Sequence, residues 1–454
     1  MKKYVCNVLK YIGIFLVAVL VLFLLLVLTA KIPKEKITDN LKESLPFFKE
    51  NRGIERLSPK KEYTYIHYYA DSTLLNIIYG IDSENTVKSV VEAKYYEQYK
   101  AEVNKYFIRA VEENIEPNQE YLRYWHGGMV VLRPLLVFFN MEQIYLINKI
   151  ALWGLAIALY LLLFMKSKKL AIIYAISIVL IAFPYVPMCF EYSWTFYIMF
   201  MVSIIAILLD KPSRGNSFLY KLFFITGIVT CYLDFLTTEL ITILVPVLLV
   251  LVIRKEEKRI TDFKDTFKFI FVSCALWLCG YSFMWLAKWI IASLVLGINA
   301  MDYVKENLIL RINGLQGLPT YEILYKNVIS NNLRNLDIIN IVKNESTKKA
   351  ICLVLLGTLL LVFDWKNIKK KWFALLVFLI SLVPYARYLF LANHSYRHSL
   401  FTYRAQIITI IGLGIVIVEC LNYKLLNKVN IKGIKNIWRK NGKNRTNDTN
   451  TVPK

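Results

Sequence analysis

Long apolar runs constrain this chain more than any other feature. A helix that crosses the hydrocarbon core of a bilayer needs roughly 20 apolar residues. Because 57% of the residues are hydrophobic and 20% are charged, a bilayer accommodates these runs more directly than a soluble core does. We therefore predict an all-α polytopic membrane protein with about ten transmembrane helices, at residues 8–30, 143–165, 170–188, 194–209, 218–233, 236–253, 266–292, 350–363, 372–391 and 405–421.

The first apolar run follows a basic segment, Met1–Lys10, and extends to Ala30. It is longer than the apolar region of a signal peptide, and no small-residue cleavage site closes it. We therefore expect it to be retained as the first transmembrane helix.

Lysine and arginine gather in alternate connecting segments, which predicts the orientation of the chain. Short cytoplasmic loops carry an excess of these residues, and here the excess falls at the N-terminus, near 166–169, 211–221, 254–268 and 366–371, and in the tail. This pattern favours a turn at Asp234–Thr238 over one long helix from 219 to 254, because a single helix would place later basic clusters outside. We expect both termini on the cytoplasmic side of the cell membrane.

The same distribution explains the formal net charge of +23. Residues 31–141 hold sixteen Lys or Arg and sixteen Asp or Glu, so the positive excess lies mainly at the cytoplasmic edge, where it can contact anionic membrane lipid. No nucleic-acid-binding motif accompanies it, and we expect no nucleic acid as a partner.

The apolar runs divide the chain into six parts. The first loop contains three helix-like stretches: a short apolar segment at 74–78, a charged amphipathic segment at Val87–Glu113, and a segment at Tyr121–Phe139 that we expect to form a helix at the membrane interface. The parts are the first transmembrane helix (1–30), a large extracytoplasmic loop domain (31–142), transmembrane helices 2–7 (143–292), a second extracytoplasmic segment (293–349), transmembrane helices 8–10 (350–421) and a basic cytoplasmic tail (422–454).

Four acidic residues on the predicted outer side are candidates for chemistry. Asp71 precedes a short apolar segment, so it suits either a helix N-cap or a general base for a hydroxyl group. Asp234, Glu239 and Glu191 lie at short turns between apolar runs, where the alternatives are helix capping and a role at a cavity. Asp71 and Asp234 are also possible ligands of a divalent cation.

All four histidines, His67 among them, fall on the same predicted outer side. His394 and His398 are four residues apart and would share one helix face, although no zinc-protease pattern accompanies them. Arginines lie near them in sequence, and Arg geometry suits phosphate; the alternative is interfacial anchoring to lipid headgroups. The candidate phosphate- or substrate-binding residues are Arg133, His126, His394, His398, Arg397, Arg404 and Glu239, with Arg387 beside them.

Nucleotide-dependent chemistry is not indicated by any sequence motif. The chain has no Walker A loop, no G-x-G-x-x-G and no G-x-S-x-G. We therefore expect no soluble nucleotide cofactor, and leave open a divalent cation such as Mg²⁺ or Mn²⁺.

Four short motifs accompany this layout: Tyr69-Ala70-Asp71, Tyr124-Trp125-His126-Gly127, Tyr232–Thr238 and Asn393-His394-Ser395. They look like those of a group of uncharacterised bacterial membrane proteins, and the layout of residues 1–421 resembles the GT-C superfamily of membrane glycosyltransferases. One departure is that the paired acidic motif of that family is absent, and the only Asp-x-Glu is Asp82–Glu84.

The resemblance implies transfer of a sugar from a polyprenyl-phosphate donor to a glycan, lipid or protein acceptor at the extracytoplasmic face. It implies that Asp71 is the base, and that Asp234 or Glu191 orients the acceptor or holds a divalent ion. Arg404, Arg133 and the histidines would neutralise the leaving phosphate.

Three other functions remain open from the sequence. A transporter or flippase of a lipid-linked sugar would need charged residues along a path through the bilayer, whereas here they cluster at one edge. A polysaccharide polymerase or ligase would place its large loop late in the chain. A non-enzymatic assembly protein could use the outer Tyr, Trp and Arg residues as an interface.

Overall fold

The computed structural model describes residues 2–56, 65–98, 103–260, 262–313, 321–336, 357, 364 and 371–422. This part of the chain is helical, as predicted, with one antiparallel pair of short strands. Of the predicted segments, the helix at 350–363 lies outside the described residues except for residue 357, and the tail lies outside them after residue 422.

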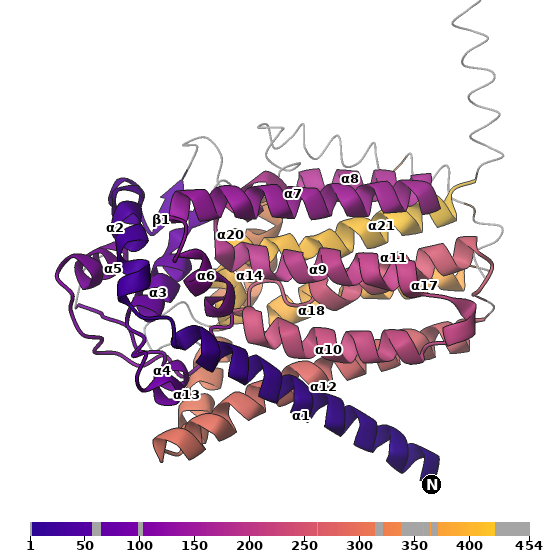
Figure 1. Ribbon diagram of the computed structural model, residues 1–454. Helices are drawn as coiled ribbons and strands as arrows, with labels where there is room; N and C mark the ends of the chain where they lie inside the picture. Colours follow the sequence, from indigo (N-terminus) through magenta and orange to yellow (C-terminus); the bar gives the residue numbers. More distant parts are fainter. Residues whose placement is uncertain are drawn as a thin grey trace, which may run out of the picture.

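Long helices lie side by side and form a bundle (Figure 1). Helix α1 crosses this bundle obliquely, and the N-terminus lies at the end where α7 passes into α8, α9 into α10, and α11 into α12. The bundle contains α1 (Lys2–Ala30), α7 (Met141–Lys166), α8 (Lys168–Leu180), α9 (Phe190–Leu209), α10 (Ser217–Leu233), α11 (Ile241–Glu256), α12 (Phe263–Leu296), α17 (Trp372–Ser381), α18 (Val383–Phe390) and α21 (Ile407–Cys420).

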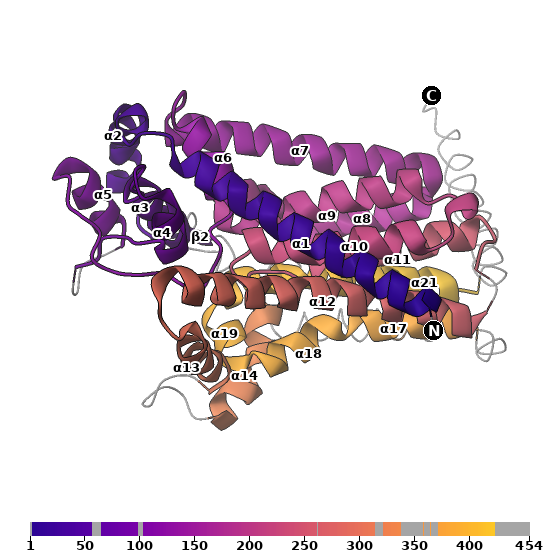
Figure 2. The same cartoon turned by 60° about the horizontal axis from the view of Figure 1, so that its bottom comes forward.

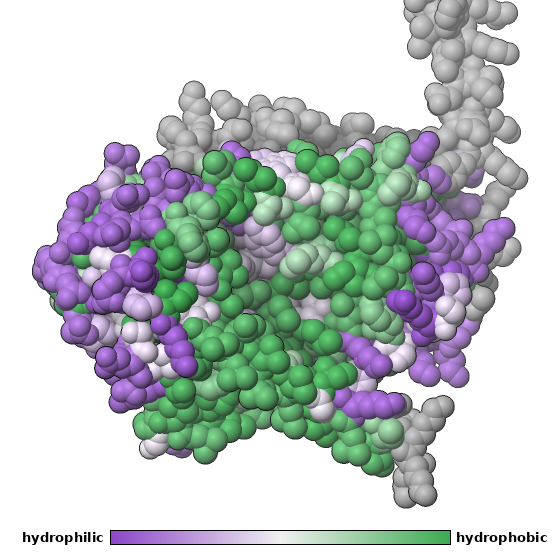
Figure 3. Space-filling model, viewed as in Figure 1, coloured by the Kyte–Doolittle hydropathy of each residue, from purple (hydrophilic) through white to green (hydrophobic). Residues whose placement is uncertain are grey.

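The outside of the bundle is apolar. Figure 3 shows a broad hydrophobic surface over the helices, with hydrophilic residues gathered at its two ends. Exposed apolar surface of this extent marks contact with a membrane or a partner. Six helices among the described residues are long and apolar enough to cross a membrane, namely Val8–Ala30, Met141–Lys166, Phe190–Leu209, Phe263–Leu296, Trp372–Phe390 and Ser399–Cys420.

One predicted span is interrupted, and one predicted turn is present. Residues 170–188 do not form one helix, because α8 ends at Leu180, Ala182 adopts a left-handed conformation (φ 53°), and a short 3-10 helix, η1 (Phe183–Met188), follows with two prolines. The turn predicted near 234–238 is present, since α10 ends at Leu233 and α11 begins at Ile241.

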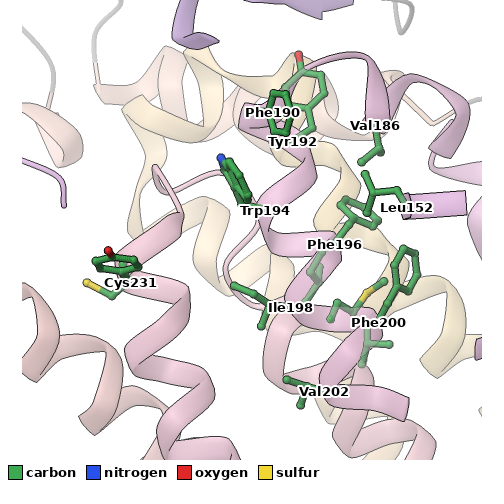
Figure 4. Packing of buried hydrophobic residues seen from close by; sticks show 14 of the residues in the cluster. Leu152, Val186, Phe190, Tyr192, Trp194, Phe196, Ile198, Phe200, Val202 and Cys231 are labelled. Carbon is green, nitrogen blue, oxygen red and sulfur yellow. The ribbon is translucent and has the colours of Figure 1, made fainter. Parts of the chain in front are cut away.

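Helix α9 lies among the other helices and is buried on most of its surface. Phe196 and Phe200 lie on the side of α9 that faces Leu152 of α7 and Val186 of η1, whereas Trp194 lies on the other side (Figure 4). Ring contacts join Phe183 of η1 to Phe196 at 5.7 Å and to Phe200 at 5.6 Å. This packing fixes the position of the α9 N-terminus, where the candidate site lies.

Helices α10 and α12 pack with their backbones in direct contact. A Cβ atom at Gly227 would overlap the carbonyl of Trp277, and one at Gly280 would overlap the carbonyl of Phe224. Small residues at a crossing allow two helices to approach this closely.

A smaller domain covers one end of the bundle (Figure 1). It is held there by backbone acceptors, since Trp125 donates to the Met284 carbonyl (3.0 Å) and Lys288 to the Val91 carbonyl (2.8 Å). Its elements are α2 (Glu35–Glu50), β1 (Ile54–Arg56), β2 (Tyr65–His67), α3 (Tyr68–Tyr79), α4 (Thr86–Glu92), α5 (Val103–Glu112) and α6 (Met129–Leu135).

Both long helices predicted in this domain are wrong in extent. The amphipathic segment Val87–Glu113 is divided into α4 and α5, and Ala93, after α4, has a left-handed conformation (φ 48°) that ends the helix. Of the interfacial segment Tyr121–Phe139, only the seven residues of α6 are helical, because the Gly127–Gly128 pair before α6 packs irregularly against the bundle.

Short helices from the later part of the chain lie at the same end as this domain (Figure 2). His394 lies in α19 and His398 directly follows it, and α19 packs against α14 and α18. These elements are α13 (Ala300–Asn313), α14 (Tyr321–Arg334), α19 (Ala392–Arg397), α20 (Ser399–Thr402) and the 3-10 helix η4 (Tyr403–Gln406).

Candidate functional site

A cavity of about 100 Å³, here called the histidine cavity, lies where the smaller domain meets the bundle. All four histidines of the chain line it, although they come from three distant segments. Its lining residues are His67, Tyr69, Ala70, Thr73, Leu74, Tyr121, Tyr124, His126, Glu191, Phe235, His394, His398 and Phe401.

His67 and Glu191 form a buried pair in this cavity. His67 Nδ1 is hydrogen-bonded to Glu191 Oε2, and each residue is 6% exposed. The His67 ring stacks on Tyr69 with ring centroids 5.6 Å apart. Burial opposes protonation of His67, but the charge and hydrogen bond of Glu191, and the nearby Asp71, outweigh it and raise the pKa of His67 above its ordinary value.

Asp71 lies directly behind this pair and contacts the start of α9. Its Oδ2 accepts from the Phe190 backbone N–H (2.8 Å) and from the Tyr145 hydroxyl (2.9 Å), and its Oδ1 accepts from the Glu191 N–H (3.1 Å). Asp71 therefore satisfies two backbone donors in the first turn of α9. Burial raises the pKa of Asp71 to about 7, although these hydrogen bonds oppose the rise.

Of the two roles open to Asp71 from the sequence, that of N-cap of its own helix is excluded by the structure. Helix α3 begins at Tyr68, with His67 as its N-cap residue, so Asp71 lies inside the first turn. Asp71 instead accepts a hydrogen bond from the backbone of Phe190 in α9, 119 residues later in the chain.

The segment Trp125–Gly128 adopts an irregular backbone against the bundle. His126 is left-handed (φ 56°), which is uncommon for a residue with a side chain. The Gly127 N–H donates to the Tyr232 carbonyl (3.1 Å), and a Cβ atom at Gly128 would lie 2.8 Å from Trp194. Both glycines are therefore required by close approach, and this approach places the His126 ring in the cavity.

His126 is a neutral imidazole. Its Nε2 lies 3.1 Å from the Tyr121 carbonyl, which can only accept, so Nε2 carries the proton. Burial, reinforced by the charge of Lys288, lowers the pKa of His126 to about 3.

The turn between α10 and α11 forms another wall of the cavity. Asp234 accepts from the backbone N–H of Thr237 (3.1 Å) and from its hydroxyl, which holds the turn. Leu236 is left-handed (φ 63°), a costly conformation for this residue. Its carbonyl accepts from His394 Nε2 (2.8 Å), so the strained turn positions that histidine.

Glu239, after this turn, pairs with Arg387 of α18. The guanidinium donates Nε to Oε1 (2.9 Å) and Nη2 to Oε2 (3.1 Å), which is the bidentate geometry that Arg favours. Both residues are buried, and Arg387 also donates to the Leu236 carbonyl (2.8 Å). Glu239 is thus committed to an ion pair that holds α18 against the turn.

A larger apolar groove of about 500 Å³ adjoins the histidine cavity. Tyr124 lines both spaces, so they meet at its side chain. The groove is lined by Arg123, Tyr124, Leu236, Glu239, Leu240, Trp277, Leu278, Tyr281, Ser282, Trp285, Trp289, Tyr303, Val304, Arg387, Phe390 and Leu391.

A third space of about 70 Å³, here called the tyrosine pocket, adjoins the histidine cavity on another side. Tyr69, Thr73 and Tyr121 line both, while Arg123 lines the tyrosine pocket and the apolar groove. The pocket also contains Asn76, Tyr95, Glu97, Val103 and Tyr106. Each of the three spaces therefore adjoins the other two, and their linings are apolar in the groove, mixed in the histidine cavity and polar in the tyrosine pocket.

The candidate arginines are not gathered at one point. Arg404 is buried, lies 4.3 Å from the centre of the Tyr192 ring and, among the described residues, has no carboxylate partner. Arg397 is exposed on α19. Arg133 is buried in α6, where it donates to the carbonyls of Ile78 and Ile32, so it joins α3 to the turn that follows α1.

Within the described residues, no three His, Cys, Asp or Glu side chains are close enough together to hold a metal ion. Asp71 and Asp234 are engaged in separate hydrogen-bond networks with Tyr145 and Thr237.

Comparison of the chain with protein-family models, with curated proteins and with solved structures gives no significant match. The function is therefore argued from the site alone.

Sequence reasoning placed His126, His394, His398 and Glu191 on one side, and the structure brings them together. It did not nominate His67, although this residue was on the same predicted side. It also did not identify the groove. The spacing of Trp277, Tyr281, Trp285 and Trp289 along one helix face was the signal that could have shown it.

Proposed function

We propose that this protein is a membrane glycosyltransferase of the GT-C type, which transfers a sugar from a polyprenyl-phosphate donor to an acceptor hydroxyl. The observation that carries the proposal is the junction at Tyr124 between an apolar groove and a cavity lined by ionisable side chains. An isoprenoid chain suits the groove, and a phosphosugar suits the polar end.

The proposed orientation places this junction at the extracytoplasmic surface. The N-terminus and the basic connections between α7 and α8, α9 and α10, and α11 and α12 share the opposite end of the bundle (Figure 1). Positive residues favour the cytoplasmic side. We therefore place the smaller domain outside the cell membrane, with about ten helical crossings in the whole chain.

In this proposal the donor lies along α12, with its phosphate near Arg123, where the groove meets the tyrosine pocket. Arg123 lies 5.1 Å from the centre of the Tyr121 ring and interacts with Tyr303. A fixed cation at this place would stabilise the charge that develops on the leaving phosphate. His394 and His398, with rings 4.7 Å apart, line the cavity beside it.

The acceptor would approach through the tyrosine pocket. Tyr69 and Tyr121 line its junction with the cavity, and tyrosine offers both a flat apolar face and a hydrogen-bonding hydroxyl. A glycan acceptor matches this lining best.

A flippase for the same lipid is the second candidate. Transport predicts charged groups along the whole path, and the groove instead carries its charged residues, Arg123, Glu239 and Arg387, at the end near the cavity. This distribution favours transfer.

The test is sugar transfer by purified protein in nanodiscs, from a panel of polyprenyl-phosphate sugars to short glycan and lipid acceptors. The proposal expects at least one donor to yield a glycoside and free polyprenyl phosphate. If no donor reacts and none binds, the protein is not a transferase of this class; binding without transfer would support the flippase.

A further inference from the structure

We propose that His67 and Glu191 form the proton-transfer pair of the histidine cavity, with His67 removing the proton from the acceptor hydroxyl. This inference rests on the proposed function and assigns the base to a residue that the resemblance does not nominate.

The first argument is the direction of the hydrogen bond. A carboxylate only accepts, so the Glu191 contact fixes the proton on His67 Nδ1 and leaves the lone pair on Nε2. Among the described residues, His67 Nε2 makes no hydrogen bond, and the ring lines the cavity. A base must present a free lone pair to the space where the substrate lies, and His67 does so.

The second argument is that Asp71 is occupied. Its two oxygens accept from two backbone N–H groups and a tyrosine hydroxyl, and it does not line the cavity. Those contacts hold the residues on either side of the Phe190–Glu191 peptide bond. Asp71 is therefore a positioning residue that fixes the backbone of Glu191.

Two of the other histidines are less suited to act as the base. His126 has its pKa lowered to about 3, which makes it a poor base near neutral pH. His394 uses Nε2 to donate to the Leu236 carbonyl. In His67 a carboxylate is bonded to one ring nitrogen, an arrangement that orients the ring and stabilises its protonated form.

The step balances without any further reactant. The acceptor oxygen forms a bond to the anomeric carbon as Nε2 takes the hydroxyl proton. The bond from that carbon to the phosphate oxygen breaks, and its electron pair leaves with the lipid phosphate. The anomeric configuration inverts, and the imidazolium then releases its proton to water.

The pH dependence follows from the groups around His67. Glu191 of α9 and Asp71 of α3 are acidic, while His126, His394 and His398 share the cavity. Because the carboxylates raise the pKa of His67, kcat should rise with pH and reach half its maximum above about 6.5, the ordinary value for histidine. Removal of the Glu191 charge should move this midpoint to lower pH.

The experiment measures kcat and KM for transfer against pH, for wild type, His67→Asn, Glu191→Gln and Glu142→Gln. Asparagine can keep a donor to Glu191 but cannot take a proton. We expect His67→Asn to lower kcat about 10²–10⁴-fold with little change in donor KM. Glu191→Gln should lower kcat and shift the midpoint down, and Glu142→Gln, exposed at the start of α7, should match wild type.

The outcomes separate the two proposals. An inactive wild type contradicts the proposed function itself. An active wild type with His67→Asn above half of the wild-type kcat overturns the assignment of the base. If His67→Asn fails to fold, Glu191→Gln decides, and an unshifted pH midpoint overturns the pair.

Discussion

Replacement of Asp71 by alanine tests whether this residue holds the site together. The substitution removes an acceptor that serves Phe190 N–H, Glu191 N–H and the Tyr145 hydroxyl, all of them buried. A buried donor without a partner costs about 1–3 kcal/mol. If each of the three donors costs the lower value, Asp71→Ala should lower the free energy of unfolding by about 3 kcal/mol. For a chain of 454 residues, the melting midpoint should then fall by roughly 3 °C.

The assay is thermal unfolding in nanodiscs at a fixed scan rate, because membrane proteins commonly unfold irreversibly. Asp39→Ala is the matched control, since Asp39 is exposed on α2 and a surface change of this kind costs about 0.5 kcal/mol or less. If Asp71→Ala has the same melting midpoint as the wild type but has lost all transfer activity, Asp71 is a catalytic base and the positioning role is refuted.

Three further substitutions test the packing around the site. Gly127→Ala would place a Cβ atom 2.5 Å from the Tyr232 carbonyl, so it should lower the free energy of unfolding by about 1–3 kcal/mol. The control Gly154→Ala has no atom within 4 Å of the added Cβ and should be neutral or stabilising. Equal melting temperatures of the two variants would refute the close approach at Gly127. Glu239→Leu should lower the free energy of unfolding by about 3–5 kcal/mol because it leaves the Arg387 guanidinium buried and unpaired. Adding Arg387→Met to Glu239→Leu should restore most of that loss. Additive costs in this double-mutant cycle would count against a coupled pair. Ser282→Trp should fill the apolar groove and raise the KM for the donor at least about tenfold. Leu294 lies on the same helix and is 79% exposed, so Leu294→Trp should leave this KM unchanged. An unchanged KM in Ser282→Trp would show that the donor does not bind in the groove.

Apolar length and charge asymmetry predict the helical class and the break between α10 and α11. These are local properties, so they can be read from consecutive residues. They also place the histidines on one side of the chain, and the structure then brings them to one cavity.

The roles of single residues could not be predicted in the same way. Asp71 looks like the cap of its own helix because the segment after it is apolar, yet its partners lie 74 and 119 residues away. Arg133 resembles an interfacial anchor, yet it bonds two carbonyls from α3 and the turn that follows α1. Such long-range partners leave no periodic pattern in the sequence.

The helices predicted in the first loop fail for a related reason. The Gly127–Gly128 pair follows the shape of Tyr232 and Trp194, which belong to other helices, so tertiary packing decides the backbone there. Of the two strained residues, His126 lines the histidine cavity and Leu236 lines the adjoining apolar groove, which agrees with the tendency of strain to gather at functional sites.

The central claim is that the apolar groove and the histidine cavity form one site for a lipid-linked sugar. Crosslinking with a polyprenyl phosphate that carries a photoreactive group near its phosphate tests this claim most directly, with the modified residues located by mass spectrometry. The account predicts labels at Tyr124, Arg123 and Trp285, and their loss in Ser282→Trp. Labels confined to the exposed faces of α1 and α7, unchanged in that variant, would contradict it.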